Sequence, residues 1–327
     1  MKNPLHALFL LCTPYVFSQD TAGFFSPSPE FSKNRFTGVA TVQSAGYAGS
    51  IAALSAAWYS GYTRTSFHSF DDSPEWLQMD KAGHLITSWY LGRVSSDMYE
   101  WSGVKKKKAV LFGALSGWGY LTAIETMDGF SDGWGFSWSD FGANTLGSGL
   151  IIGQKFLDTK NSLLAKGFRG MSIKFSFHQT IFPQFREELL GKNFGEQLVK
   201  DYNGQTYWLS FNLSSLAGNY FKKGAWQPFP SSVESGRFPK WLNIAFGYGA
   251  EGMISGRPGY SYTYPNGNTI EFERYRQYYL SLDIDLSRIK TKSHFLKALA
   301  ETFCFIKIPA PALEWNKYGM KFHPFYY

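Results

Sequence analysis

The hydrophobic residues of this chain change their spacing near residue 160, and this change constrains the fold more than any other feature of the sequence. Before it, apolar residues recur every three to four positions, as they do in helices; after it, they alternate with polar residues, as they do in strands. The two patterns follow one another and do not interleave. They predict an α+β protein in which a compact four-helix unit precedes an antiparallel β-rich half.

Four segments of the first half have helical character. The first, 36–63, has no charged residue and is rich in Ala, Ser and Gly, which favours close packing against other helices or against lipid. The others span 80–101, 109–124 and 140–157. The uncharged cores of the last two are 16 and 14 residues long, shorter than the roughly 20 that a membrane crossing needs. We expect the unit to be periplasmic, to lean on a membrane or to be partly embedded in one.

The second half contains segments in which apolar and polar residues alternate. The alternation is strong at 171–178, 207–213, 242–248 and 277–286 and weaker at 320–327. Such strands have one apolar and one polar face. The pattern fits one layer of a soluble sheet, and it also fits a partial or small outer-membrane-type barrel, although a closed barrel generally needs about eight strands or more. Helices are expected in the connections near 185–200 and 293–303.

The N-terminus has the features of a secretory signal. Lys2 precedes an apolar run at 5–17, and Ser18 supplies a small residue near the cleavage site before Asp20. Lipoprotein processing at Cys12 is not favoured, because Leu11 stands where a small residue is required. The expected organisation is a signal peptide at 1–19, a linker at 20–35, a helical domain at 36–160 and a β-rich domain with helical insertions at 161–327.

Composition and charge point to the cell envelope. Aromatic residues make up 19% of the chain, which is typical of proteins with aromatic girdles at a membrane interface. The helical half carries a net charge of −2 and the β-rich half +8, which suits anionic lipid headgroups or lipopolysaccharide. No nucleic-acid-binding motif is present. We expect membrane association, an envelope lipid or outer-membrane protein as partner, and a location at the outer membrane or the periplasmic face of the envelope.

Two positions on the second helix and one on the third are candidate site residues. Asp80 and His84 are four residues apart and share a helix face, where the carboxylate can accept a proton from the imidazole and raise its basicity. The structural alternative is that Asp80 caps the helix and His84 is a satisfied core histidine. Glu125, near a helix C-terminus, opposes the helix dipole and needs a cation or a protonated partner opposite it.

The start of the fourth helix supplies the remaining candidates. Asp140 suits the first helical turn, behind a cap at Ser137 or Ser139. Asn144 lies on the same face, inside an otherwise apolar helix. Gly147 and Gly149 reduce helix propensity and are expected to permit close packing. The helix ends are therefore expected to bring the polar side chains to one place.

The order and spacing of these residues resemble a known family. Asp80-Lys81-x-x-His84, then Glu125, then Asp140-x-x-x-Asn144-x-x-Gly147 looks like the YfiM-like family of predicted periplasmic lipoproteins, and is more distantly similar to VanZ-like membrane proteins. The resemblance covers about residues 78–155. It departs from the first family in the absence of a lipid-acceptor cysteine, and from the second in having Asp128 where a Gln is usual. It implies positions for a site and no reaction.

Two hypotheses follow from these observations. The first is a structural or assembly protein at the outer membrane, in which the polar cluster is a satisfied network that fixes helix register. The second is an enzyme acting on an envelope lipid or cell-wall intermediate. Asp80, His84, Glu125, Asp140 and Asn144 would form its catalytic site, with His84 as general base oriented by Asp80. No cofactor is expected, although His84, Glu125 and Asp140 can also serve as ligands for a divalent metal such as Mn or Mg.

Overall fold

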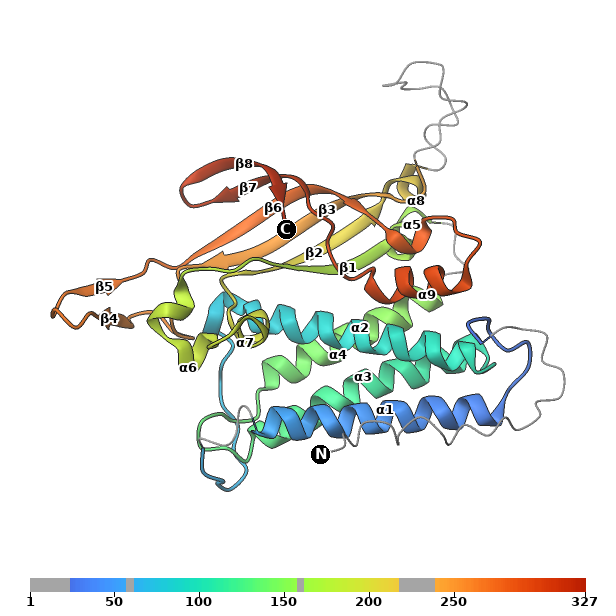
Figure 1. Cartoon of the computed structure of the whole chain (residues 1–327), viewed down its shortest axis with the longest axis horizontal. Coiled ribbons are helices and arrows are strands. Elements are labelled where there is room, and N and C mark those ends of the chain that lie inside the picture. Colours follow the sequence, from blue (N-terminus) through green and yellow to red (C-terminus); the bar gives the residue numbers. More distant parts are fainter. Residues whose placement is uncertain (1–23, 57–61, 158–161, 218–238) are drawn as a thin grey trace, which may run out of the picture.

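The computed structural model describes residues 24–56, 62–157, 162–217 and 239–327, so the expected signal peptide lies outside the described residues. Four long helices stack beneath a sheet, with α2 nearest to the sheet and α1 farthest from it (Figure 1). They are α1 (Lys33–Leu54), α2 (Met79–Trp101), α3 (Lys106–Asp128) and α4 (Trp138–Phe156). The expected four-helix unit is confirmed, and Ser137 caps α4 by accepting the N–H of Asp140.

Helices α2, α3 and α4 approach closely at glycines. A Cβ atom on Gly113 would overlap the carbonyl oxygen of Gly92, and one on Gly147 would overlap the carbonyl oxygen of Leu85. The prediction that Gly147 permits close packing is therefore confirmed. The same prediction is wrong for Gly149, where an added Cβ would meet nothing within 4 Å.

The β half forms a six-stranded antiparallel sheet of order β1-β2-β3-β6-β7-β8, and β4 and β5 form a separate hairpin. The strands are β1 (Met171–Phe177), β2 (Gln205–Asn212), β3 (Leu242–Glu251), β4 (Ser261–Thr263), β5 (Thr269–Glu271), β6 (Tyr275–Ile284), β7 (Ala310–Asn316) and β8 (Gly319–Tyr326). The α+β class is confirmed. In the described residues the sheet is open, with β1 and β8 at its edges.

Short helices fill the connections, including the two that the sequence predicted. They are α5 (Leu163–Arg169), α6 (Glu187–Leu190), α7 (Phe194–Lys200), α8 (Leu213–Ala217) and α9 (His294–Phe303), with 3-10 turns η2 (Glu75–Gln78), η3 (Phe182–Phe185) and η5 (Leu286–Arg288).

The two faces of the sheet differ in polarity as expected, but beyond β1 the polar face is the buried one. Lys174 of β1 and Asp283 of β6 are fully buried and form an ion pair, with 2.7 Å between Nζ and Oδ2. Thr206 of β2 and Tyr326 of β8 share a hydrogen bond between their hydroxyl groups at 3.0 Å. Because three strands separate β2 from β8, this contact requires the sheet to curl around its polar face.

Helix α2 joins the two halves of the chain. Ile86 and Trp89 of α2 share a hydrophobic cluster with Ile173 of β1, and the hydroxyl group of Tyr248 on β3 donates to the carbonyl oxygen of Leu77. The two expected domains therefore share a core, and the boundary between 160 and 161 stays a prediction because it falls in the undescribed residues 158–161. None of the described helices combines the length and the apolar character that a membrane crossing requires.

Candidate functional site

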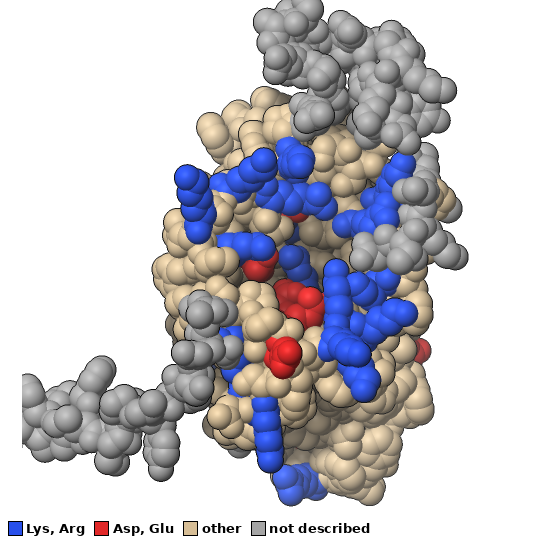
Figure 2. Space-filling model, turned by 90° about the vertical axis from the view of Figure 1, so that its right-hand side faces the viewer, with Lys and Arg blue, Asp and Glu red and all other residues tan. Residues whose placement is uncertain are grey.

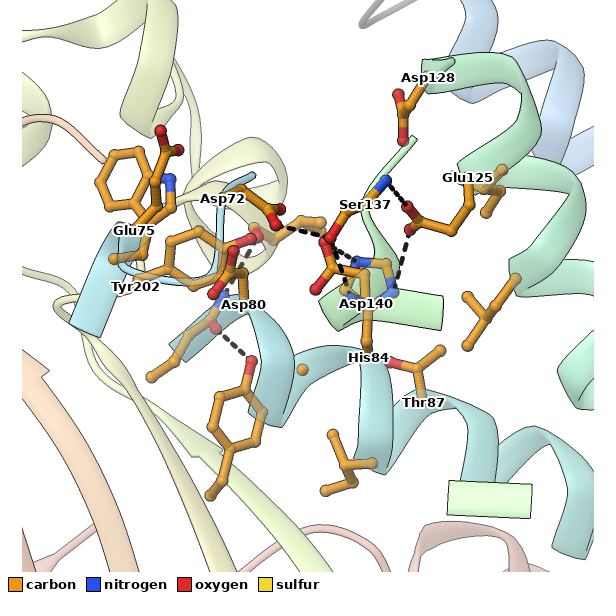
Figure 3. Close-up of a pocket in the computed structure, with 18 of the residues that line it drawn as sticks. Asp72, Glu75, Asp80, His84, Thr87, Glu125, Asp128, Ser137, Asp140 and Tyr202 are labelled. Carbon is orange, nitrogen blue, oxygen red and sulfur yellow. Dashed lines mark hydrogen bonds and ion pairs between the residues drawn. The ribbon is translucent and has the colours of Figure 1, made fainter. Parts of the chain in front are cut away.

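Four of the predicted polar residues line a pocket of about 520 Å³ where the helices meet the sheet, namely Asp80, His84, Glu125 and Asp140, and Asn144 is buried behind His84 (Figure 3). The polar wall of the pocket consists of the loop before η2, the start of α2, the end of α3 and the start of α4. Its apolar wall comes from α2, α3, β1, α7 and the segment after α9, with the residues Ile86, Leu121, Ile124, Phe175, Leu198, Val199 and Phe305. The convergence of helix ends that the sequence predicted is thus present.

Lys81 is the centre of one half of the polar wall. Its Nζ lies 2.6 Å from Asp72 Oδ2, 2.7 Å from Asp80 Oδ2 and 3.1 Å from Asp140 Oδ1. Ser137 Oγ donates to Asp72 Oδ1 at 2.6 Å and accepts the N–H of Asp140. A single ammonium group therefore joins the loop, α2 and α4 by charge-assisted contacts.

These contacts give neighbouring carboxyl groups different pKa values. Burial alone would raise the pKa of Asp72, but hydrogen bonds with Asp140, Lys81 and Ser137 outweigh it and lower that pKa to about 2. Burial raises the pKa of Asp80 to about 7 despite the charge of Lys81. Burial would lower the pKa of Lys81, and the charges of Asp80 and Asp140 overcome it and raise that pKa. At neutral pH, Asp72 and Lys81 are therefore charged and Asp80 is partly protonated.

His84 belongs to the other half of the polar wall. Its Nδ1 lies 3.1 Å from Asn144 Oδ1 and 3.5 Å from Glu125 Oε1, and its Nε2 lies 3.9 Å from Asp140 Oδ2. Because the amide oxygen of Asn144 can only accept, we assign the proton of the neutral imidazole to Nδ1. In this tautomer Nε2 has the free lone pair and can accept a proton.

Glu125 is a buried acid that keeps its proton at neutral pH. Burial, followed by the negative charges of Asp140 and Asp128, raises its pKa to about 9. The backbone N–H of Ser137, whose nitrogen is 3.4 Å from Glu125 Oε2, opposes this shift. A neutral carboxyl group does not oppose the helix dipole, which explains how Glu125 is tolerated in the last turn of α3.

Part of this half of the wall lacks hydrogen-bond partners. The side-chain nitrogen of Asn144, a fully buried residue, has none among the described residues. Asp140 Oδ1 has none either, and its contact with Lys81 Nζ is an ion pair without hydrogen-bond geometry. Buried amide groups in proteins are usually bonded, so these atoms indicate a place where a ligand or water completes the site.

Among the residues that the structure describes, two sets of side chains are close enough to share a metal ion. One is His84, Glu125 and Asp140, and the other is Asp72, Asp80 and Asp140; within each set the possible ligand atoms lie within 4.8 Å of one another. The second set already holds the ammonium group of Lys81, which occupies the position that a cation would take. A metal is therefore compatible only with the first set, and it would have to displace the proton of Glu125.

The structure brings Asp80, His84, Glu125 and Asp140 to one pocket with Asn144 directly behind His84, but it pairs them differently from the prediction. The Asp80 carboxylate accepts from the backbone and side chain of Lys81, and no hydrogen bond or ion pair joins it to the ring of His84. It does not cap α2 either, because the cap position is Gln78. Sequence reasoning missed Asp72, which lies in a loop without periodicity, and the central role of Lys81. The lysine stands in the quoted motif, so its position beside Asp80 was the available signal.

Comparison with known proteins matches the part of the chain that contains this site. Residues 68–153 match a family described as predicted periplasmic lipoprotein, DUF2279, and this range includes Asp72 as well as the predicted site residues. The finer resemblance to YfiM-like and VanZ-like proteins stays a prediction. No curated protein and no solved structure matches the chain. The family match confirms the expected location, and the chain is an exported protein of the outer membrane or the periplasmic face of the envelope.

Proposed function

We propose that the pocket is the active site of an enzyme that carries out acid–base chemistry on an envelope lipid. One observation supports this above the others. His84 and a protonated Glu125 lie side by side on the wall of the pocket, next to the unpartnered amide nitrogen of Asn144. A histidine beside a carboxyl group whose pKa is strongly raised, in one pocket, is typical of catalytic sites.

His84 is the proposed general base. The hydrogen bond from its Nδ1 to Asn144 Oδ1 holds the ring in the tautomer whose Nε2 can take a proton from a hydroxyl group or water. Asp140 Oδ2, 3.9 Å from Nε2, stabilises the imidazolium ion that forms. Asn144 thus has the orienting role that we had expected of Asp80.

Glu125 is the proposed general acid. A carboxyl group with a pKa of about 9 holds a proton at neutral pH and can give it to a leaving group. These roles describe hydrolysis or group transfer at an ester or phosphoester, in which the base activates the attacking hydroxyl and the acid protonates the leaving oxygen.

The shape and lining of the pocket favour a lipid over a sugar intermediate. The apolar wall of Ile86, Leu121, Ile124 and Phe175 continues from the polar wall. Such an arrangement accepts a polar headgroup at the carboxylates and an acyl chain along the hydrocarbon side chains.

The test is an incubation of the full chain with a total lipid extract of the envelope, followed by mass spectrometry. A product formed by the wild type and lost in both His84→Gln and Glu125→Gln is the expected result. Glu271→Gln, an exposed carboxylate on β5, is the matched control and should keep full activity. Absence of any product with the wild type, or unchanged turnover in both variants, contradicts the proposal.

A structural role is the second candidate, because the Lys81 contacts tie three segments together. The free energy of unfolding of His84→Ala separates the two functions. If the cluster is a structural network, the variant should lose about 3–5 kcal/mol. If the cluster is a catalytic site, the loss should be small or the variant more stable.

A divalent metal held by His84, Glu125 and Asp140 would change the proposed reaction mechanism, but the active site would still be the same pocket. Metal analysis of the purified protein tests it. Stoichiometric Mn or Zn that disappears in His84→Ala would replace the acid–base roles with metal-assisted activation of water.

A further inference from the structure

We propose that the outer, apolar face of the sheet binds a lipid bilayer and buries its side chains in the hydrocarbon. The covered face of this sheet holds charged groups, among them Lys174, Asp283 and Glu314. The opposite face is covered by α2 and the residues just before it along β1, part of β2 and the end of β3, where Met79 and Leu77 pack against Tyr248 and Ala250. Beyond that it exposes the large apolar side chains Leu209, Phe246, Tyr278, Leu282, Trp315, Met320 and Phe322. A water-soluble sheet has the opposite arrangement.

The strand register places these side chains in continuous rows across the sheet. One row, from β2 to β8, is Leu209, Phe246, Leu280, Leu313 and Phe322. A second row, two residues along each strand, exposes Tyr278, Trp315 and Met320, and its members on β3 and β2, Tyr248 and Tyr207, lie under α2 and the residues before it. On the other side of the first row lie Phe211, Ile244 and Leu282. None of these rows contains a charged residue.

The height of this band fits a membrane. From Leu242 to Tyr248, β3 spans about 20 Å at roughly 3.4 Å per residue. Lipid-facing sheets present an apolar band of about 25 Å with tyrosine and tryptophan at its borders. The exposed Tyr278 and Trp315 form such a border at one end of the band.

Basic residues lie beyond both ends of the band. Arg276 is the next outward-facing residue of β6 after Tyr278, and it is exposed. At the other end, exposed Lys240 and Trp241 precede β3. Figure 2 looks at this second end and shows Lys and Arg around a hollow. A pocket between α2, α3, α4 and β1 is lined by five basic side chains and three acidic ones, namely Arg93, Lys106, Lys155, Arg169 and Arg288 with Asp97, Glu100 and Asp285. Cations at both borders complement anionic headgroups.

Helix α9 adds a second apolar element at this basic end (Figure 1). It exposes the apolar side chains Phe295, Leu296, Leu299 and Phe303. Exposed lysines, Lys292 and Lys297, lie just before the helix and within it. An amphipathic helix with flanking lysines is typical of a segment that lies at a membrane interface.

Other features favour lipid over a second copy of the chain as the occupant. The edge strand β8 carries Lys321 and Pro324, which are residues that discourage pairing with a further strand. The chain is an envelope protein, so a membrane is adjacent to it.

The experiment is flotation of the full chain with vesicles of phosphatidylethanolamine and phosphatidylglycerol. The test variant carries Phe246→Asp and Leu282→Asp, at side chains that are 51% and 50% exposed. Its binding to vesicles should fall by about tenfold or more, because carboxylates are unfavourable in hydrocarbon. The matched control carries Leu115→Asp and Leu146→Asp, at helical side chains that are 54% and 60% exposed, and should float like the wild type.

Further measurements separate the contribution of the anionic headgroups from other causes of vesicle binding. Vesicles of phosphatidylcholine alone should bind the wild type several-fold more weakly, because they lack anionic headgroups. His84→Gln should float normally, so that failure of the proposed enzyme activity leaves this result unaffected. The proposal is overturned if the test variant floats like the wild type or if the wild type stays soluble beside the anionic vesicles. It is equally overturned by a lipid-free dimer that the test variant dissociates, since the face would then bind a second copy.

Discussion

Replacement of Glu125 by Gln should stabilise the protein, and the gain should grow with pH. Burial near Asp140 and Asp128 raises the pKa of Glu125 from 4.5 to about 9. Between these values the folded chain holds a proton that the unfolded chain has released. The free energy of unfolding therefore falls as pH rises, by about 1.4 kcal/mol per pH unit. Gln has the same shape and no proton to lose, so the variant lacks this dependence.

The size of the effect follows from the same pKa shift. About 2.5 pH units separate pH 7 from the ordinary pKa of a glutamate, which corresponds to about 3 kcal/mol. The advantage of Glu125→Gln should approach zero below about pH 4.5 and reach about 5 kcal/mol near pH 8.5. Asp80, whose pKa is raised to about 7, also makes the free energy of unfolding fall as pH rises. Because both proteins contain Asp80, its contribution cancels in the difference between them.

Urea unfolding followed by tryptophan fluorescence, at several pH values between about 5 and 8.5 in the presence of EDTA, measures this difference. The free energy of unfolding of Glu271→Gln, on the exposed hairpin strand β5, should change with pH in the same way as that of the wild type. The reasoning is refuted if the stability of Glu125→Gln has the same pH dependence as that of the wild type. A dependence that disappears on addition of Mn²⁺ would instead show that Glu125 ionises to bind metal.

Other substitutions test the remaining contacts. Lys81→Met should lower the free energy of unfolding by about 3–5 kcal/mol, because Asp72, Asp80 and Asp140 lose their shared cation; an unchanged urea midpoint would contradict the central role of the lysine. Gly147→Ala should cost about 1–3 kcal/mol through overlap with the carbonyl oxygen of Leu85. Gly149→Ala, on the same helix but in open space, should be neutral or stabilising by up to about 1 kcal/mol, so equal effects at the two glycines, measured by thermal unfolding, would contradict the packing.

The sequence by itself determined the long helices, the strongly alternating strands and four of the polar residues that line the pocket. Periods of 3.6 and 2 follow directly from helix and strand geometry, so the four helices and the strongly alternating strands could be located. Strand β7 was not predicted, because only Leu313 and Trp315 show the apolar alternation along it. The polar residues at the ends of α2, α3 and α4 could be assigned to one place because charged groups in apolar helices must find one another.

Only the tertiary structure decided how those residues pair. Spacing by four positions puts Asp80 and His84 on one face of α2, but it does not tell which neighbour each side chain reaches. Lys81 holds Asp80, since an adjacent ammonium group is a stronger partner than a neutral imidazole. His84 is left to Asn144 and Glu125, which come from α4 and α3.

The tertiary structure also decided which face of the sheet is covered. Alternation of apolar and polar residues shows that a strand has two different faces. It does not tell which of the two faces is buried. The curl of the sheet encloses Lys174 with Asp283, because each buried charge has its partner on another strand of that same face. The apolar rows are consequently exposed on the outside of the sheet. No local pattern in the sequence predicts this exposure.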